Sequence, residues 1–224
     1  MPRIARVVVP RHPHHIVQRG NRRQKVFFSD LDKEEYLKIL KEHCQKFGVQ
    51  IWSYCLMDNH VHFIAVPEEE GRLSLAFGHA HWRYTKMINR REKWRGYLWQ
   101  GRFSSYVLDE NYLYAAVRYV ENNPVEAGLV ARAEDYRWSS ARARILNIKD
   151  ELLSDFFLTT EIANWSEFLQ SAYEEDPDKK LINVHLNTGR PLAAPEYIDW
   201  LQFRTGVKLS KSKPGPKPRV GTVN

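Results

Sequence analysis

Two histidines separated by one residue, His60 and His62, begin an alternating apolar run that ends at Val66. The run is rich in β-branched and aromatic residues, which predicts a strand. Because strand side chains alternate between faces, both imidazoles lie on one face of this strand. Two such imidazoles can bind one metal ion or one phosphate. The alternative is a pair of polar residues on a half-solvated strand face.

A tyrosine and an asparagine, Tyr119 and Asn123, lie at the end of a predicted helix over residues 112–122. Their four-residue spacing places both side chains on one helical face, one turn apart. A tyrosine phenolate can attack a phosphodiester and form a covalent phosphotyrosine. An amide oxygen beside two imidazoles makes a metal site with open positions for a phosphate oxygen and the leaving 3′-oxygen. Spacing alone does not distinguish Tyr119 from Tyr112 or Tyr114, and core packing is the alternative role for each.

The elements that must position these side chains follow a β-α-β-β-α-β-α order. Strands are predicted over residues 14–18, 49–57, 60–66 and 104–108, and helices over 31–47, 73–89 and 112–122. The last of these helices is expected to end before Asn123 and Pro124. This order predicts an α+β fold with a ferredoxin-like (RRM-like) antiparallel sheet and helices packed on one face.

Further helices are predicted over residues 136–146, 159–173 and 195–203. We therefore expect a main domain over residues 1–146 and a helical C-terminal extension over residues 147–210. Residues 211–224 are rich in Pro and Lys, which predicts a flexible basic tail.

Basic residues are segregated along the chain, whose formal net charge is +7. Residues 1–29 contain seven basic and no acidic residues, and residues 72–102 contain eight basic residues against Glu92 alone. Acidic residues prevail between Glu134 and Glu175, where nine of them stand against four basic residues. Clustered Lys and Arg bind phosphates and release counterions, so the pattern indicates a polyanion partner such as nucleic acid. A basic surface that serves only solubility is the alternative.

Composition excludes several other classes of protein. The chain has 224 residues, 43% of them hydrophobic, enough to bury a core. Its two cysteines, Cys44 and Cys55, are too few for a disulfide framework or a cysteine zinc site. No signal peptide and no membrane span are expected, because no apolar run is long enough. A reducing, cytoplasmic setting without a membrane partner fits best.

Five short motifs, taken together in this order, resemble one family. The first three are Arg19-Gly20-Asn21-Arg22-Arg23, residues 54–62 (Tyr-Cys-Leu-Met-Asp-Asn-His-Val-His) and residues 100–103 (Gln-Gly-Arg-Phe). The last two are residues 118–130, which begin Arg-Tyr-Val-Glu-Asn-Asn-Pro, and residues 136–140 (Tyr-Arg-Trp-Ser-Ser). The chain thereby resembles the REP-associated tyrosine transposases, single-tyrosine HUH nucleases related to insertion-sequence transposases. The resemblance covers roughly residues 3–146.

The resemblance implies roles for the residues above. His60 and His62 match the metal-binding pair of the family, Tyr119 matches its nucleophile and Asn123 its oxygen ligand. Such enzymes nick single-stranded DNA beside hairpins of repeated extragenic palindromes, leave a 5′-phosphotyrosyl link and a free 3′-OH, and can rejoin strands. The implied cofactor is a divalent ion, Mg or Mn, and the implied location is the cytoplasm, at the nucleoid. The implied DNA contacts are Arg19, Asn21, Arg22, Arg23, Lys25, Arg83, Lys86, Arg90, Arg91 and Arg102.

One departure from the family pattern and two alternative functions remain. Glu121 stands where many relatives have an apolar residue, and we expect it to face outward into solvent. A non-catalytic, regulatory nucleic-acid-binding protein could use the same basic surface. A zinc-dependent hydrolase is disfavoured because no His-x-x-x-His pair or suitably spaced Glu base accompanies the histidines. The sequence leaves monomer and homodimer open.

Overall fold

The computed structural model describes residues 7–171, 181–182, 184–185 and 188–209. The predicted basic tail over residues 211–224 lies outside these ranges. None of the helices in the described ranges is both long and apolar enough to cross a bilayer.

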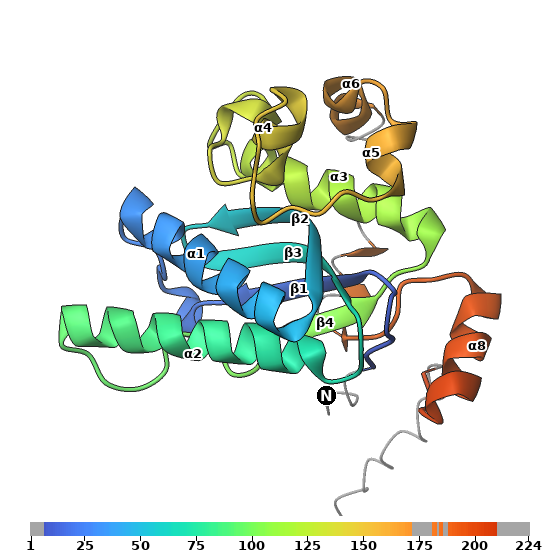
Figure 1. The fold of residues 1–224 in the computed structure, drawn as a ribbon, viewed down its shortest axis with the longest axis horizontal. Helices are drawn as coiled ribbons and strands as arrows, with labels where there is room; N and C mark the ends of the chain where they lie inside the picture. Colours follow the sequence, from blue (N-terminus) through green and yellow to red (C-terminus); the bar gives the residue numbers. More distant parts are fainter. Residues whose placement is uncertain (1–6, 172–180, 183, 186–187, 210–224) are drawn as a thin grey trace, which may run out of the picture.

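The elements, in chain order (Figure 1), are β1 (His14–Arg19), η1 (Asn21–Arg23), α1 (Asp30–Phe47), β2 (Val49–Met57), β3 (His60–Pro67), α2 (Arg72–Glu92), β4 (Ser104–Val107), α3 (Glu110–Glu126), η2 (Ala133–Asp135), α4 (Ser140–Ile145), α5 (Phe157–Glu161), α6 (Trp165–Gln170) and α8 (Pro195–Thr205).

The four strands form one antiparallel sheet in the order β2-β3-β1-β4. β1 pairs with β3 on one side and with β4 on the other. β2 and β3 are joined as a hairpin. This strand order, with α1 and α2 as the two crossovers, confirms the predicted α+β, ferredoxin-like fold.

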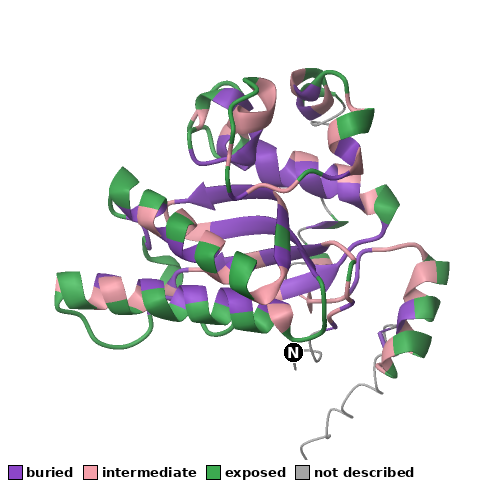
Figure 2. Ribbon diagram, viewed as in Figure 1, coloured by how far each residue is buried: buried purple, intermediate pink, exposed green. Residues whose placement is uncertain are grey.

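Helices cover both faces of the sheet, which is buried between them (Figures 1 and 2), whereas the sequence predicts helices on one face only. α1 and α2 pack on the face that carries Ile16, Val61 and Phe63. α3 packs on the opposite face, over Ile64 and Tyr106. Strand alternation decides which layer each side chain joins, so the even-numbered residues at the start of β3 face α3.

Local signals account for the limits of α1. Ser29 and Asp32 form a capping box at its start, each side chain bonding the backbone N–H of the other. Gly48 ends the helix with a positive φ of 61°, a conformation that glycine adopts without steric cost. The chain then turns directly into β2.

α3 runs one turn further than the sequence predicts. Pro124 lies inside the helix, which continues to Glu126 instead of ending at Asn122. Proline disfavours helical geometry in the residue before it and cannot donate a backbone hydrogen bond. The helix is buried on the sheet at this point, and this packing outweighs the local preference. Asn123 therefore stays in helical register with Tyr119.

The short helices after η2 pack on α3, whereas α8 lies apart from them (Figure 1). The helix predicted over residues 159–173 is two helices, α5 and α6, separated at Asn164, whose side chain caps α6. α8 packs through Leu201 on a small cluster that includes Val7 and Val107.

Candidate active site

His60 and His62 stand at the start of β3 and face α3. Their ring centroids are 5.0 Å apart. His62 is 1% exposed, and His60 at the strand end is partly exposed. Across the pairing of β1 with β3, Arg19 is opposite His60 and Val17 is opposite His62. The pair therefore lies on a covered face of the sheet, which does not fit a half-solvated strand face.

α3 places Tyr119 and Asn123 over the two histidines. The ring of Tyr119 is edge-on to that of His62, with centroids 5.6 Å apart. The side chain of Asn123 hydrogen-bonds both His60 and Tyr119. Both α3 side chains are more than nine-tenths buried. The structure thus brings together the four side chains that the sequence places in one centre.

The other two tyrosines of α3 have different surroundings. Tyr114 donates its hydroxyl to Glu161 of α5 at 2.7 Å. Tyr112 is a partly buried residue beside the core under α3. The ring contact with His62 therefore favours Tyr119 over Tyr112 and Tyr114 as the tyrosine of this centre. Sequence spacing does not distinguish the three.

Burial keeps the two imidazoles uncharged. Desolvation and the positive charge of Arg19 lower the pKa of His60 to about 4. Desolvation, together with neighbouring imidazoles and Arg19, lowers the pKa of His62 well below its usual value. Both rings are neutral at physiological pH, which is the state that binds a metal through nitrogen.

The phenol of Tyr119 is held in its neutral form. Burial raises its pKa, while the charge of Arg19 and the hydrogen bond from Asn123 act in the opposite direction. Those two groups stabilise the phenolate that a nucleophilic tyrosine must reach.

The donors in this centre fit a divalent cation without any carboxylate. Two neutral imidazoles and the amide oxygen of Asn123 are available within contact of one another. In the part of the chain that the structure describes, no group of three or more His, Cys, Asp or Glu side chains is arranged to hold a metal ion. An ion in this centre would therefore take its oxygen ligand from the amide, with open positions for phosphate.

His15 on β1 also belongs to this centre, although it is in none of the motifs. It is fully buried, with its Nε2 atom 3.0 Å from Nδ1 of His62 and its Nδ1 atom 2.7 Å from the hydroxyl of Tyr106. Its ring centroid is 5.9 Å from that of Tyr119. The sequence signal that could have identified His15 is strand alternation, because it places His15 and Arg19 on one face of β1.

Glu121 is buried, so the expectation that it faces solvent is wrong. Its Oε1 atom accepts hydrogen bonds from the hydroxyls of Ser140 at 2.5 Å and Ser53 at 3.1 Å, and Oε2 accepts one from the indole of Trp165 at 2.6 Å. Arg144 lies 3.7 Å away as a buried counter-ion. Burial raises the pKa of Glu121, and Arg144 opposes that shift. The carboxylate points away from the histidines and joins α3 to β2, α4 and α6.

The predicted DNA contacts fall into two groups. One group surrounds the end of β1, beside His60, where the loop over residues 98–101 is tied to the strand by a 2.8 Å hydrogen bond from the Gln100 N–H to the Arg19 carbonyl. Lys25 in this group is paired with Asp58. The group consists of Arg19, Asn21, Arg22, Arg23, Lys25 and Arg102.

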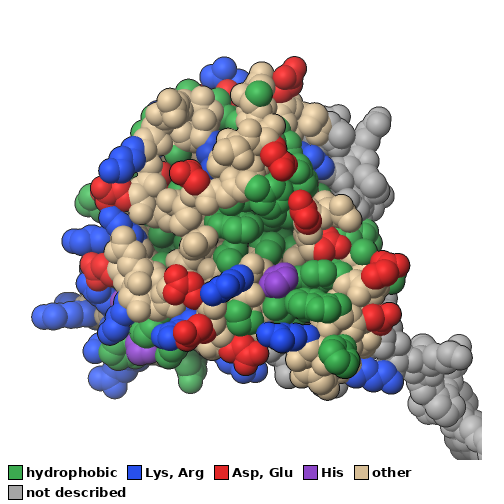
Figure 3. Space-filling model, turned by 45° about the vertical axis from the view of Figure 1, so that its right-hand side comes forward, with side chains coloured by type: hydrophobic (Ala, Val, Ile, Leu, Met, Phe, Trp, Pro, Cys, Tyr) green, Lys and Arg blue, Asp and Glu red, His purple; other side chains and the backbone are tan. Residues whose placement is uncertain are grey.

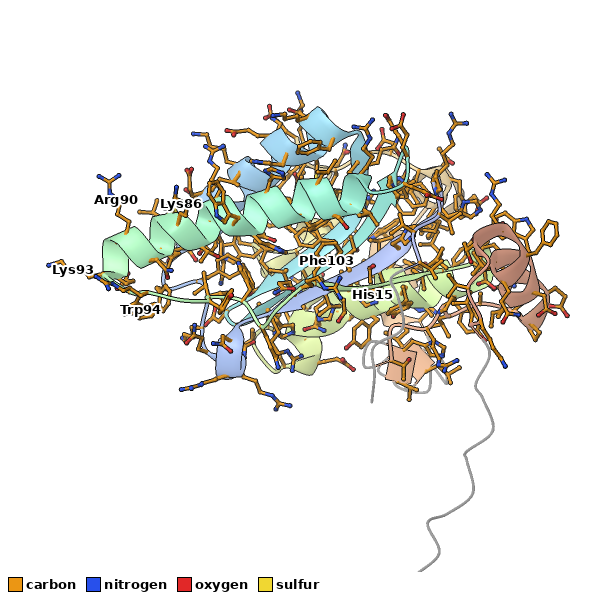
Figure 4. All side chains as sticks on the ribbon, turned by 90° about the horizontal axis from the view of Figure 1, so that it is seen from below. His15, Lys86, Arg90, Lys93, Trp94 and Phe103 are labelled. Carbon is orange, nitrogen blue, oxygen red and sulfur yellow. The ribbon has the colours of Figure 1, made fainter. Side chains whose placement is uncertain are left out.

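The second group is carried by α2 and consists of Arg83, Lys86, Arg90 and Arg91. Arg83 is paired with Glu42 and Arg91 with Asp32, which neutralises part of this charge. Arg90 is exposed and has no ion pair within the described ranges. Figure 4 shows Arg90 and Lys93 projecting from the end of α2, and Figure 3 shows basic side chains gathered along that edge of the molecule. The first group lies beside the centre, whereas the second lies on α2, which packs on the opposite face of the sheet from α3.

Comparison with known proteins agrees with the motifs. The family model described as IS200-like transposase matches residues 8–123, just over half of the chain, a range that contains the histidine pair, Tyr119 and Asn123. None of the curated protein sequences compared with the chain is a match.

A solved structure shares the fold of this chain. The chain is similar to a REP-associated tyrosine transposase bound to a REP hairpin, with 17% identity and a TM-score of 0.56, over 70% of this chain and 93% of that one. A putative transposase from Deinococcus radiodurans R1 is 19% identical, with a TM-score of 0.38, over 55% of this chain and 97% of that one. The resemblance that the motifs indicate is confirmed, and the chain belongs to the IS200-like transposase family.

Proposed function

We propose that the protein is a metal-dependent enzyme that nicks and rejoins single-stranded DNA beside hairpins, with Tyr119 as its nucleophile. The observation that carries the proposal is the position of Asn123, whose side chain hydrogen-bonds both Tyr119 and His60. One amide thus connects a buried phenol to a pair of neutral imidazoles. A nucleophile beside a cation site is the arrangement that phosphodiester transesterification requires.

The chemistry is a reversible exchange of phosphoester bonds. The oxygen of Tyr119 bonds to phosphorus and the bond from phosphorus to the 3′-oxygen breaks, which leaves a 5′-phosphotyrosine and a free 3′-OH. The proton that the phenol loses is balanced by the one that the leaving oxygen gains. Attack by a 3′-OH on the phosphotyrosine reverses the step and rejoins the strand. A Mg or Mn ion, held by His60, His62 and Asn123, would supply positive charge to the phosphate and the leaving oxygen.

The other residues of the centre prepare Tyr119 for this step. Arg19, opposite His60 on the neighbouring strand, brings a positive charge that favours the phenolate and attracts a phosphate. Asn123 orients the phenol by its hydrogen bond. The burial of the ring against His15 and His62 restricts its rotation.

The surface beside the centre suits an unpaired strand. Phe28, Trp94 and Tyr97 are exposed aromatic side chains, and Tyr97 is 84% exposed. Trp94 contacts Phe28 edge-on, and Arg91 lies over the ring of Phe28. Aromatic rings among basic residues bind single strands by base stacking and phosphate contacts. The solved relative is bound to a REP hairpin, and we propose hairpin-bearing single-stranded DNA as the partner of this chain too.

We further propose that residues 1–146 form the HUH single-tyrosine domain and that residues 147–210 support it. Trp165 and Leu169 of α6 lie in the same buried cluster as Tyr119, so this extension holds the helix that carries the nucleophile. A DNA substrate implies action in the cytoplasm, at the nucleoid.

A non-catalytic DNA-binding protein is the second candidate, and one observation favours it. Tyr119 is only 7% exposed and burial raises the pKa of its phenol, so it does not lie open to a DNA strand.

An adduct assay separates the two candidates. Labelled single strands that carry hairpins are incubated with the protein and Mg or Mn, and covalent adducts are counted after denaturation. The enzyme forms an adduct that EDTA prevents and that Tyr119→Phe abolishes, with hairpin affinity nearly unchanged. Tyr114→Phe, which removes a hydroxyl on the same helix that bonds Glu161, is the matched control and keeps the adduct. An adduct that survives in Tyr119→Phe would contradict the proposal.

A further inference from the structure

Three buried side chains form a hydrogen-bonded relay behind the proposed metal site. The hydroxyl of Tyr106 is 2.7 Å from Nδ1 of His15, and Nε2 of His15 is 3.0 Å from Nδ1 of His62. The three residues are each at most 1% exposed. His62 makes no other hydrogen bond through its ring within the described ranges. Figure 4 shows His15 within the layer between sheet and α3.

Proton counting allows the relay two directions. Each neutral imidazole has one N–H and one lone pair, so the contact between His15 and His62 uses one proton. In one direction, Nδ1–H of His62 donates to Nε2 of His15, whose Nδ1–H donates to Tyr106. The Nε2 atom of His62 then keeps its lone pair for a metal. In the other direction, Tyr106 donates to His15, His15 donates to His62, and Nε2 of His62 carries a proton and binds no ion.

The charge arrangement along β1 selects the first direction. His15, Val17 and Arg19 follow one another on the same face, and His62 is opposite Val17. His62 therefore lies between the uncharged His15 on one side and the guanidinium of Arg19 on the other. A nearby cation favours the lone pair of a neutral imidazole on its own side and the N–H on the far side.

We propose that His15 is a positioning residue that accepts the Nδ1–H of His62 and so fixes the tautomer and ring orientation in which Nε2 of His62 can bind the cation. Outer-shell acceptors of this kind orient metal-binding imidazoles and strengthen their basicity. The inference rests on the proposed function for its metal, but the tautomer itself is a property of the metal-free chain.

A second buried pair shows what a merely structural histidine does here. His81 of α2 lies 3.0 Å from the hydroxyl of Tyr36, on the other face of the sheet. Burial lowers the pKa of both His81 and His15 to about 3. The two histidines share burial and a tyrosine partner, and only His15 contacts a site histidine. His81 is therefore the matched control.

The test compares three variants with the full-length wild type. His15→Phe keeps a ring but removes the acceptor, His15→Gln keeps a polar atom near the Nε2 position, and His81→Phe makes the same ring change outside the site. We expect His15→Phe to weaken Mn²⁺ binding by about 10- to 100-fold in calorimetry, with His15→Gln recovering most of that loss and His81→Phe binding like wild type. Hairpin affinity without metal stays unchanged in all three.

Nitrogen-15 NMR of the metal-free wild type gives a separate readout. The proton of His62 is expected on Nδ1, and in His15→Phe the signals are expected to report a mixture of both tautomers. A His62 proton on Nε2 in the wild type, or equal metal affinities in His15→Phe and wild type, would overturn the inference. A wild type that binds no metal but shows the Nδ1–H tautomer would contradict the proposed function and leave the role of His15 supported.

Discussion

Asn123 lies one helical turn after Tyr119, and its side chain hydrogen-bonds the phenol and, on the sheet, the imidazole of His60. The contact links the nucleophile that we propose, on α3, to the cation site that we propose, on β3. It crosses the interface between this helix and the sheet. It exists because α3 continues through Pro124, which keeps Asn123 in the helical register. If the helix ended at Asn122, the helix would not hold the side chain of Asn123 one turn after Tyr119.

Removal of this amide is expected to shift the pH dependence of adduct formation. The hydrogen bond from Asn123 lowers the pKa of Tyr119, so Asn123→Ala raises that pKa further. Less phenolate is then present at neutral pH, and the alkaline rise in rate moves to higher pH. Adduct rates measured at saturating Mn²⁺ from pH 6 to above the midpoint of the wild-type profile check the shift.

Asn122→Ala is the control for this experiment, because Asn122 donates to the carbonyl of Leu169 at 2.8 Å and does not face the histidines. It is expected to leave the profile in place. An Asn123→Ala profile with wild-type midpoints and only a lower plateau would show that the amide acts on the metal alone.

Much of this centre could be predicted because its signals are local. The His60/His62 alternation, the four-residue spacing of Tyr119 and Asn123, and the order of strands and helices each depend on residues close in sequence. The role of His15 could not be predicted in this way. It depends on the register between β1 and β3 and on the packing of α3 over both strands.

Glu121 shows a second kind of limit. A lone glutamate in a helix is usually solvated, and its partners here come from residues 53, 140, 144 and 165, which no periodicity connects. The packing of α4 and α6 on α3, together with Ser53 of β2, covers Glu121. The sequence signal for this burial is therefore distributed over the whole chain.

Removal of one partner of the Glu121–Arg144 pair is expected to lower the free energy of unfolding strongly, whereas replacement of both partners is expected to lower it less. Arg144→Met leaves a buried carboxylate without its counter-ion, and Glu121→Gln leaves a buried guanidinium, so each is expected to lower the free energy of unfolding by about 3–5 kcal/mol. The double variant removes both charges and is expected to lose less than the sum of the two. Urea unfolding of the four proteins measures this coupling, and additive losses would show that the pair does not interact.

Buried histidines are expected to make the protein sensitive to acid. Burial lowers the pKa of His81 to about 3, whereas a histidine in the unfolded chain titrates near 6.5. Between these values the unfolded state binds a proton that the folded state does not, so the free energy of unfolding falls as the pH falls below about 6.5. His15 and His60 contribute in the same direction.

His81→Phe isolates one of these contributions, because His81 lies outside the candidate site. Urea unfolding at pH 8 first gives the change due to packing alone. Below pH 6.5 the variant is expected to lose stability less steeply than wild type, by up to about 1.4 kcal/mol per pH unit. Parallel stability curves for the two proteins from pH 8 to 4.5 would rule out this contribution.

The exposed aromatic side chains near the end of β1 are expected to bind the unpaired part of the substrate. Trp94 and Tyr97 lie in the loop that leads to residues 98–101, which hydrogen-bond to Arg19 and Asn21. Because stacking on one aromatic ring is worth about 1–3 kcal/mol per base, Trp94→Ala or Tyr97→Ala is expected to weaken single-strand binding roughly 5- to 100-fold. Phe203→Ala removes an exposed aromatic ring on α8 and serves as the control. Fluorescence titration with a hairpin carrying a single-stranded flank, and with the blunt hairpin alone, separates the two contacts. Equal losses on both DNAs would show that these rings contact the duplex instead of the flank.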